Sequence, residues 1–286
     1  MKKTFLIALA ATALAAPAYA DHHGMSKAEH DKMHKEHSER LAKILADPAR
    51  GADAKRDQYR HPAETFEFFR LHPDHVIGEY APGGEWVSRI LGRYVNEKGK
   101  YTGLYFGTKS HFSDQQKTGI AAGIAKFPAD VAAVSGRPAT DFNAFSLSEV
   151  PEGAKGSFDR IIVMRMLHNM MNWNIADAEI KAMRDLLKDD GLLGIEQHRA
   201  KADAPFSYTN GTKGYMREAD IIKFMEVNGF DLVAKSEINA NPKDSANWPD
   251  GVWTLPPALR LKDVDRAKYE AIGETDRMTL LFKKRP

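Results

Sequence analysis

The chain has 286 residues, enough to bury a full hydrophobic core, and its composition is that of a globular protein. It contains no cysteine, so no disulfide stabilises the fold. Basic residues exceed acidic ones by only two, whereas nucleic acids and acidic membranes require a basic surface on their partners. We therefore expect neither as a partner.

The first twenty residues have the pattern of a secretory signal peptide. Lys2 and Lys3 are followed by the apolar stretch "TFLIALAATALAAP" and by the small-residue site "AYA", which ends at Ala20. The apolar stretch is short for a membrane span. We predict cleavage after Ala20, a periplasmic or secreted location, and no membrane association of the mature chain. Removing the two lysines lowers the formal net charge from +2 to zero.

Residues 21–60 are predicted to form a His-rich helix followed by a charged linker. Ser26 and Glu29 have the spacing of a capping box, and Pro48 stops the helix. Apolar residues occur only near its end, so we expect the helix to dock mainly by its C-terminal part; they are Leu41, Ile44 and Leu45.

The mature N-terminus is a candidate metal site. After cleavage the chain begins with Asp21, His22 and His23, and a free amine with histidine at position three suits the square-planar geometry of Cu(II) or Ni(II). Histidines further along fall on one face of the predicted helix, namely His30, His34 and His37. An incidental, solvated tail is the alternative.

From residue 61 onward, strand and helix patterns alternate. Pro62 suits the first turn of a helix over 61–69. Strands are predicted at 76–79, 100–107, 141–150, 158–167, 191–198, 230–238 and 277–284, and helices at 86–94, 114–127, 175–187 and 217–230. The third of these helices is predicted to end at Asp190-Gly191. Such alternation predicts a mostly parallel sheet with helices on both faces, and the last two strands suggest an antiparallel edge.

A glycine turn follows the first strand and points to a nucleotide-like ligand. The dinucleotide fingerprint G-x-G-x-x-G is not met, because its positions hold Ala81, Gly83 and Trp86. No acid follows the second strand, and no phosphate-binding loop is present. A ligand without phosphates fits better, such as S-adenosylmethionine (SAM), which would use an acid such as Glu79 and aromatic faces for its cationic part.

Several stretches carry a resemblance to class I SAM-dependent methyltransferases, and more narrowly to uncharacterised, signal-bearing bacterial predicted methyltransferases. They are "YRHPAETFEFF", "GEYAPGGEW", "MRMLHNMMNW", "GLLGIEQHRA", "GYMREADI", "GFDLVAKSEINANPKD" and "GVWTLPP". The resemblance implies a Rossmann-like domain over residues 61–286, with a mostly parallel seven-stranded sheet and an antiparallel C-terminal hairpin. Of the glycine motif of these enzymes, acid-x-Gly-x-Gly-x-Gly, only Glu79 and Gly83 stand in register, and Ala81 takes the place of the first glycine.

Candidate site residues lie where strands end, because ligands of open α/β sheets bind beyond the carboxyl ends of the strands. For cofactor binding we predict Glu79, Tyr80, Ala81, Gly83, Gly84, Tyr105, Phe106, Glu149 and Arg165. For catalysis we predict His168 and His198 as bases, Glu196 as an orienting group or metal ligand and Asn169 as an acceptor contact. For the substrate we predict Tyr215 and Arg217 at a helix mouth, and Asn239, Asn241 and Trp253 in a polar loop.

The leading interpretation is a SAM-dependent methyltransferase that acts on a small molecule outside the cytoplasm. Two alternatives stay open: a non-catalytic ligand-binding protein on the same scaffold, and a metal binder that works through the His-rich N-terminus. A dehydrogenase is disfavoured by the glycine spacing. The sequence gives no prediction of the acceptor or of the oligomeric state.

Overall fold

The computed structural model describes residues 26–82, 86–108 and 112–286. The predicted signal peptide, the candidate metal ligands Asp21, His22 and His23, and the predicted cofactor contacts Gly83 and Gly84 lie outside the described residues. Among the helices of the described part, none is both long and apolar enough to cross a membrane.

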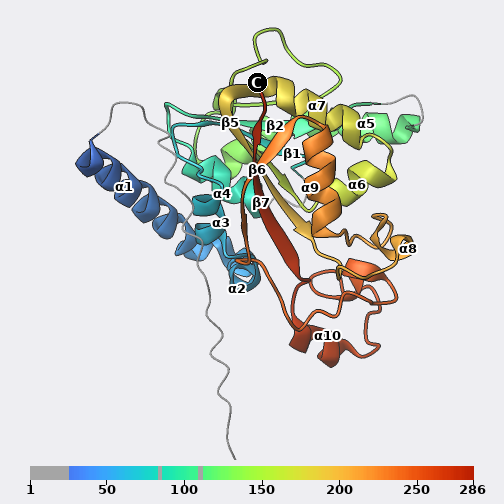
Figure 1. The fold of residues 1–286 in the computed structure, drawn as a ribbon. Coiled ribbons are helices and arrows are strands. Elements are labelled where there is room, and N and C mark those ends of the chain that lie inside the picture. Colours follow the sequence, from blue (N-terminus) through green and yellow to red (C-terminus); the bar gives the residue numbers. More distant parts are fainter. Residues whose placement is uncertain (1–25, 83–85, 109–111) are drawn as a thin grey trace, which may run out of the picture.

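Seven strands form one sheet, in the order β3-β2-β1-β4-β5-β7-β6 (Figure 1). They are β1 (Val76–Tyr80), β2 (Lys100–Tyr105), β3 (Phe142–Ser146), β4 (Phe158–Met164), β5 (Leu187–His198), β6 (Phe230–Ser236) and β7 (Arg277–Lys284). Neighbours from β3 to β5 pair in parallel, whereas β7 pairs antiparallel with both β5 and β6. The predicted fold class, with its antiparallel C-terminal hairpin, is confirmed.

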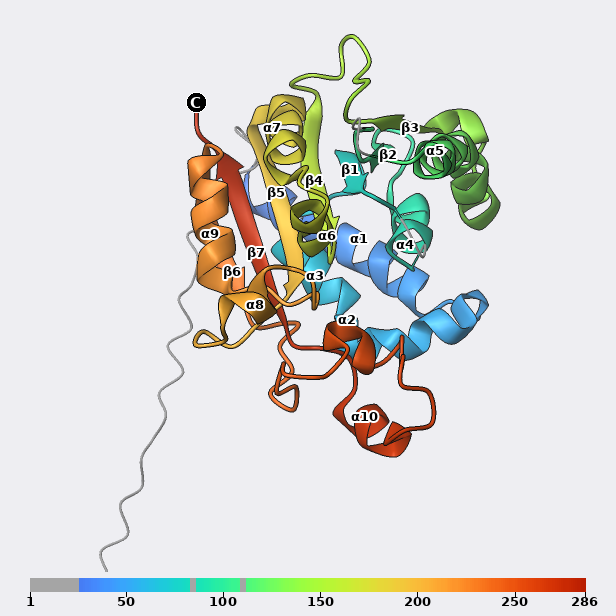
Figure 2. The same ribbon diagram turned by 90° about the vertical axis from the view of Figure 1, so that its right-hand side faces the viewer.

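Helices cover both faces of this sheet, and each face has its own core (Figure 2). One core packs the sheet against α6 (Leu167–Asn172), α7 (Ala176–Leu186) and α9 (Glu218–Val227). The other packs it against α1 (Lys27–Leu45), α3 (Pro62–Phe68), α4 (Trp86–Tyr94) and the second half of α5 (Asp114–Ser135). Shorter elements are α2 (Asp57–Arg60), α8 (Phe206–Thr209), α10 (Arg266–Ile272) and the 3-10 helices η1 (Pro48–Arg56), η2 (Ala139–Asp141) and η3 (Gly251–Thr254).

The boundary between α7 and β5 differs from the sequence prediction. The helix ends at Leu186, and Asp190-Gly191 lies inside β5 and not in a helix cap. Leu187 is fully buried, adopts extended backbone and pairs with Phe158 of β4. Pairing with a neighbouring strand outweighs the helical propensity of the segment, because the ladder satisfies the backbone groups and buries the leucine at once.

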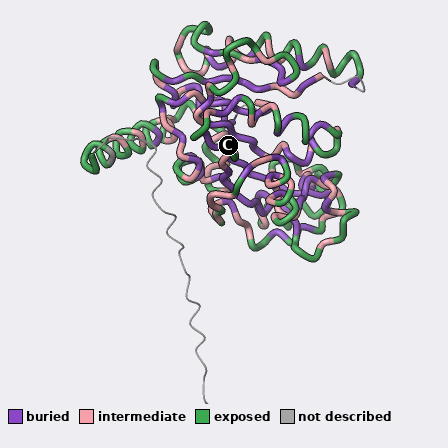
Figure 3. Tube along the Cα trace, turned by 45° about the horizontal axis from the view of Figure 1, so that its top comes forward, coloured by how far each residue is buried: buried purple, intermediate pink, exposed green. Residues whose placement is uncertain are grey.

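The N-terminal segment is held to the domain at its end, as predicted. The capping box of Ser26 and Glu29 starts α1, and Leu41 is buried in the core beside α4. Arg40 also donates a hydrogen bond of 2.6 Å from its Nε to the carbonyl of Tyr94. The earlier part of α1 projects from the body and is largely exposed (Figure 3).

The stretch predicted as a charged linker is helical instead. It forms η1 and α2, and an ion pair between Arg50 and Asp57 closes it on itself. Arg60, its last residue, is only 3% exposed. The ion pair within the segment and the long-range pair of Arg60 with Glu274 thus order a stretch that its composition predicts to be a linker.

Candidate active site

A cavity of about 570 Å³ opens at the carboxyl ends of β1, β2 and β4. This is where the strand order reverses, since β1 lies between β2 and β4, and it is the position at which open α/β sheets bind ligands. The lining residues come from the strand ends, α4, α5 and the N-terminal segment; they are Arg56, Arg60, Glu79, Ala81, Pro82, Trp86, Val87, Tyr105, Phe106, Phe112, Gln116, Gly119, Ile120, Met164, Arg165, Met166 and Trp173.

Glu79, the single acidic residue of β1, lines the cavity and is 5% exposed. Its Oε2 accepts a hydrogen bond of 2.9 Å from Ser88 of α4 and another from the hydroxyl of Tyr101 on β2. Burial raises the pKa of Glu79, and the two hydrogen bonds oppose that shift. The neighbouring strand and helix therefore fix the position of this carboxylate before any ligand arrives.

Two residues of the cavity wall have left-handed backbone. Ala81 after β1 has φ +49° and Arg165 after β4 has φ +57°. Hydrogen bonds hold both turns: the Ala81 N–H donates to the carbonyl of Leu104, and the Arg165 N–H donates to that of Glu196, each at 2.7 Å. Such backbone costs a non-glycine residue energy and is concentrated at functional sites. At Ala81 the conformation is therefore one that favours glycine, although the glycine of the methyltransferase motif is missing.

We expect Ala81→Gly to raise the free energy of unfolding by about 0.5–1 kcal/mol. Relief of the left-handed strain outweighs the extra chain entropy that glycine loses on folding. Urea unfolding at neutral pH measures the difference. A less stable variant would mean that the methyl group of Ala81 contributes packing that the strain argument omits.

A buried charge network stands behind the cavity. Arg60 donates two hydrogen bonds to Glu274, of 3.0 and 2.8 Å, and Arg277 donates one of 2.7 Å to the same carboxylate. Glu196, fully buried, pairs with Arg165 at 3.2 Å and with Arg277 at 2.7 Å. Arg56 adds a fourth guanidinium, with its Nε 3.5 Å from Glu274.

Positive charge is in excess in this network, because four arginines share two carboxylates. Burial lowers the pKa of Arg60 to about 9, and repulsion by Arg165 adds to the effect. Burial alone would raise the pKa of Glu274, but Arg277 and Arg60 lower it to about 2. Arg56, Arg60 and Arg165 also line the cavity. The wall formed by these three residues, the arginine wall, attracts anions.

The remaining walls are aromatic. The ring centroids of Phe106 and Trp173 are 5.0 Å apart, and Phe112 meets Trp173 edge-on at 6.2 Å. The guanidinium of Arg60 lies 5.1 Å from the ring centroid of Trp86. Aromatic faces of this kind bind planar rings and cationic groups.

The structure brings together five of the nine predicted cofactor residues. Those that line the cavity are Glu79, Ala81, Tyr105, Phe106 and Arg165. Tyr80 is buried in the core on the α7 side of the sheet. Glu149 lies exposed in the turn after β3, away from the cavity lining. Gly83 and Gly84 remain predictions outside the described residues.

The predicted catalytic residues lie beside the cavity and do not line it. His168 and His198 form a separate cluster, with ring centroids 5.7 Å apart. Nδ1 of His168 is 3.2 Å from Gln197, and Nδ1 of His198 is 2.6 Å from Thr275. Burial lowers the pKa of His168 to about 4 and that of His198 well below its usual range. Both imidazoles are therefore neutral at pH 7 and poor proton acceptors.

Glu196 and Asn169 are engaged inside the protein. Glu196 is the fully buried partner of Arg165 and Arg277, so it acts on the cavity only through Arg165. Nδ2 of Asn169 lies 3.4 Å from the sulfur of Met166 on its own helix.

The predicted substrate residues are also bonded within the fold. Tyr215 is fully buried and donates a hydrogen bond of 2.8 Å to Asp244, and Arg217 pairs with Asp220 at 2.7 Å. Nδ2 of Asn239 donates to Thr65 and Thr279, and Nδ2 of Asn241 to the carbonyls of Ile272 and Glu274. Trp253 lies 6.0 Å from His168 between ring centroids. In this arrangement the loop supports Glu274 and the histidine cluster.

Sequence reasoning missed Arg56 and Arg60, because their stretch was interpreted as a linker. It also missed Trp173 of the short turn after α6, which matches no helical or strand pattern. The resemblance offered a signal for two of them: Arg60 lies inside "YRHPAETFEFF", and Trp173 is the last residue of "MRMLHNMMNW".

Comparison with known proteins supports the fold and goes no further. The MccD protein matches with a TM-score of 0.51 and 9% identity over 79% of this chain and 96% of its own. A SAM-dependent methyltransferase from Aquifex aeolicus matches with a TM-score of 0.48 and 12% identity over 85% and 97%. A Burkholderia thailandensis 1,6-didemethyltoxoflavin-N1-methyltransferase, solved with S-adenosylhomocysteine, has a TM-score of 0.45 and 11% identity over 89% and 91%. No family model and no curated protein matches the chain in sequence.

The sheet order, the antiparallel β7 and the match to MccD define a Rossmann-like fold of the class I methyltransferase type. Its structural neighbours include SAM-dependent methyltransferases.

Proposed function

We propose that this protein is a SAM-dependent methyltransferase that acts on a small molecule carrying an anionic group. The proposal includes membership of the signal-bearing predicted methyltransferase family, a periplasmic or secreted location, and a small-molecule acceptor as partner. The observation that carries it is the cavity at the ends of β1, β2 and β4, which places Glu79, aromatic rings and the arginine wall around one space.

The cofactor half of the proposal rests on Glu79 and the aromatic walls. Both hydrogen bonds that described residues give to Glu79 end on Oε2, so Oε1 is the oxygen that meets a ligand. It would accept hydrogen bonds from the ammonium or ribose hydroxyl groups of SAM. Tyr105, Phe106 and Trp173 line the same space and suit an adenine ring or the sulfonium.

The acceptor half rests on the arginine wall and on the composition of the described part of the cavity lining. No histidine is present among the described residues that line the cavity, and an acceptor that is already ionised needs no base. A carboxylate oxygen would attack the methyl carbon of SAM, the carbon–sulfur bond would break, and S-adenosylhomocysteine would leave without any proton transfer. Arg56 and Arg165 would orient the carboxylate, and orientation supplies much of the catalysis in such a displacement.

A second candidate function is ligand binding without methyl transfer. The same arginine wall favours an anionic ligand and opposes the positive charge of the sulfonium. In this case the demethylated product, S-adenosylhomocysteine, or an unrelated carboxylate would bind at least as well as SAM, and no methyl group would be transferred.

Calorimetric titration of the metal-stripped mature protein with SAM and with S-adenosylhomocysteine tests the cofactor. We expect micromolar binding of both, and transfer of labelled methyl groups from SAM to carboxylate-bearing acceptors. Binding without transfer would favour the second candidate. No heat and no thermal shift at millimolar cofactor would refute the methyltransferase assignment.

Arg56→Gln tests the anionic acceptor. Arg56 is partly exposed and only loosely paired with Glu274, so the fold should tolerate the change. We expect methyl transfer to a carboxylate acceptor to fall roughly tenfold or more, as for the loss of one charge-assisted hydrogen bond. Arg137→Gln is the control, because Arg137 pairs with Asp141 away from the cavity. Equal activity in both variants would remove Arg56 from acceptor binding.

A further inference from the structure

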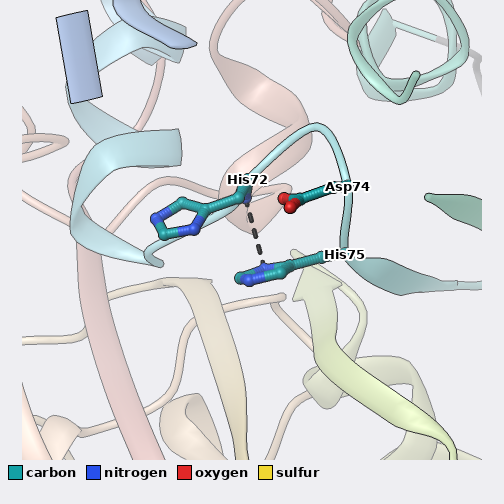
Figure 4. Close-up of side chains that lie close together, drawn as sticks. All are labelled: His72, Asp74 and His75. Atoms are coloured by element: carbon teal, nitrogen blue, oxygen red, sulfur yellow. Dashed lines mark hydrogen bonds between the residues drawn. The ribbon is translucent and has the colours of Figure 1, made fainter. Parts of the chain in front are cut away.

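A second cluster of potential ligands lies outside the cavity, on the turn between α3 and β1. Figure 4 shows His72, Asp74 and His75 close together on this turn. One donor atom from each of them lies within 4.8 Å of the other two. The imidazoles of His72 and His75 are stacked with centroids 4.4 Å apart, and the backbone N–H of His72 donates a hydrogen bond of 3.3 Å to Nδ1 of His75.

Helix α1 brings a third imidazole to the same place. The ring centroid of His37 is 4.9 Å from that of His72, although 34 positions separate the two residues in the chain. One turn earlier, Nε2 of His34 lies 3.4 Å from Glu67 of α3. Contacts between α1 and the α3 region therefore continue beyond the apolar end of α1, through histidine side chains.

We propose that His72, Asp74 and His75, with His37 as the fourth ligand, form a zinc site that fastens α1 to the domain. Imidazole nitrogens and carboxylate oxygens are both ligands of Zn²⁺, which binds four donors in a tetrahedral arrangement. Ligand bonds of about 2.1 Å place two donors of a tetrahedral ion about 3.4 Å apart. The donor atoms of His72, Asp74 and His75, which lie within 4.8 Å of one another, reach that spacing by side-chain rotations. His37 joins them by turning its ring toward the ion from its place beside His72, where the ring centroids are 4.9 Å apart.

The position of the cluster explains what the metal would do. Only the end of α1 has buried apolar contacts, and its first two-thirds are largely exposed. An ion bound by His37 from the helix and by the turn after α3 adds a cross-link at mid-helix. Because the ion binds only the docked arrangement, it stabilises that arrangement in proportion to its concentration.

Titration of metal-stripped mature protein with Zn²⁺ tests the site, together with hydrogen exchange of α1. We expect one ion per chain and slower exchange of the backbone amides of α1 when zinc is bound. Asp74→Asn and His72→Gln change exposed or half-buried side chains, so both variants should fold. Each should weaken zinc binding roughly tenfold or more and abolish the exchange effect.

Two controls separate this site from other histidines. His34→Gln changes the same helix one turn away, and the double variant His22→Gln/His23→Gln removes the predicted ligands at the mature N-terminus. Both should keep the affinity of the unmodified chain. Undiminished binding in Asp74→Asn and His72→Gln, or loss of binding only in the N-terminal double variant, would overturn the proposal.

Discussion

Glu274→Gln is expected to lower the free energy of unfolding by about 3–5 kcal/mol at neutral pH, the usual cost of breaking a buried ion pair. The substitution removes one of the two carboxylates that balance Arg56, Arg60, Arg165 and Arg277. It also places an amide N–H₂ where Arg60 and Arg277 now donate hydrogen bonds. The N–H groups of Arg60 and Arg277 would then meet a third donor, the amide, and share the single carbonyl oxygen of the glutamine as acceptor. Urea unfolding of the variant and the unmodified chain measures the loss.

The same interaction predicts how stability depends on pH. The pKa of Glu274 is about 2 in the folded protein, against 4.5 for an unperturbed glutamate. A carboxylate with a lowered pKa contributes stability that is fully present above the unfolded pKa and is lost as pH falls through the folded one. Stability should therefore fall between about pH 4.5 and pH 2, and Glu274→Gln should flatten the curve in this window.

Glu237→Gln is the matched control for this prediction. Glu237 also pairs with an arginine, Arg199, at 2.6 Å, but its side chain is 65% exposed. Solvent screens such a pair, so we expect a loss below about 1 kcal/mol. Equal losses of unfolding free energy in the two variants would show that the buried ion pairs of Glu274 stabilise the fold no more than an exposed pair does.

Glu79→Gln is expected to weaken SAM binding about tenfold to a hundredfold, the worth of a hydrogen bond to a charged group. Glutamine keeps the shape and the contacts with Ser88 and Tyr101 but loses the negative charge. Because burial raises the pKa of Glu79, the carboxylate ionises at a higher pH than an exposed one. The affinity of the unmodified chain for SAM should rise as pH increases through that raised pKa.

Calorimetric titrations with SAM at several pH values provide the measurement, and Glu149→Gln is the control. Glu149 is exposed and away from the cavity lining, so its variant should keep both the affinity and the pH dependence. A Glu79→Gln variant with the pH profile of the unmodified chain would show that Glu79 does not contact the cofactor.

Local sequence patterns predicted most elements of the fold. The predicted helix at 86–94 coincides with α4, and the predicted strand at 141–150 contains β3. These segments carry a periodic apolar pattern that their burial requires, so the pattern and the packing agree. The predicted end of α7 was wrong, because the helix stops where Leu187 pairs with Phe158, a partner almost thirty residues away in the chain.

The residues of the candidate site were also predicted correctly only in part. Glu79, Ala81, Tyr105, Phe106 and Arg165 were predicted because they follow strands, and parallel strands end at one edge of the sheet. His168 and His198 follow strands equally well, yet their rings turn into a cluster beside Gln197 and Thr275. Strand position determines where a residue lies, whereas side-chain direction is decided by the neighbours it meets.

The sequence by itself determined the strand and helix order, the parallel sheet with its antiparallel end, and the acid at the end of β1. These follow from periodicity and from turn residues, which act over a few positions. Only the tertiary structure decided that Arg56 and Arg60 line the cavity, that Glu274 balances them, and that His37 meets His72. Each of these depends on charges or rings from segments far apart in the chain, and the energy of such contacts exists only once the fold has brought them together.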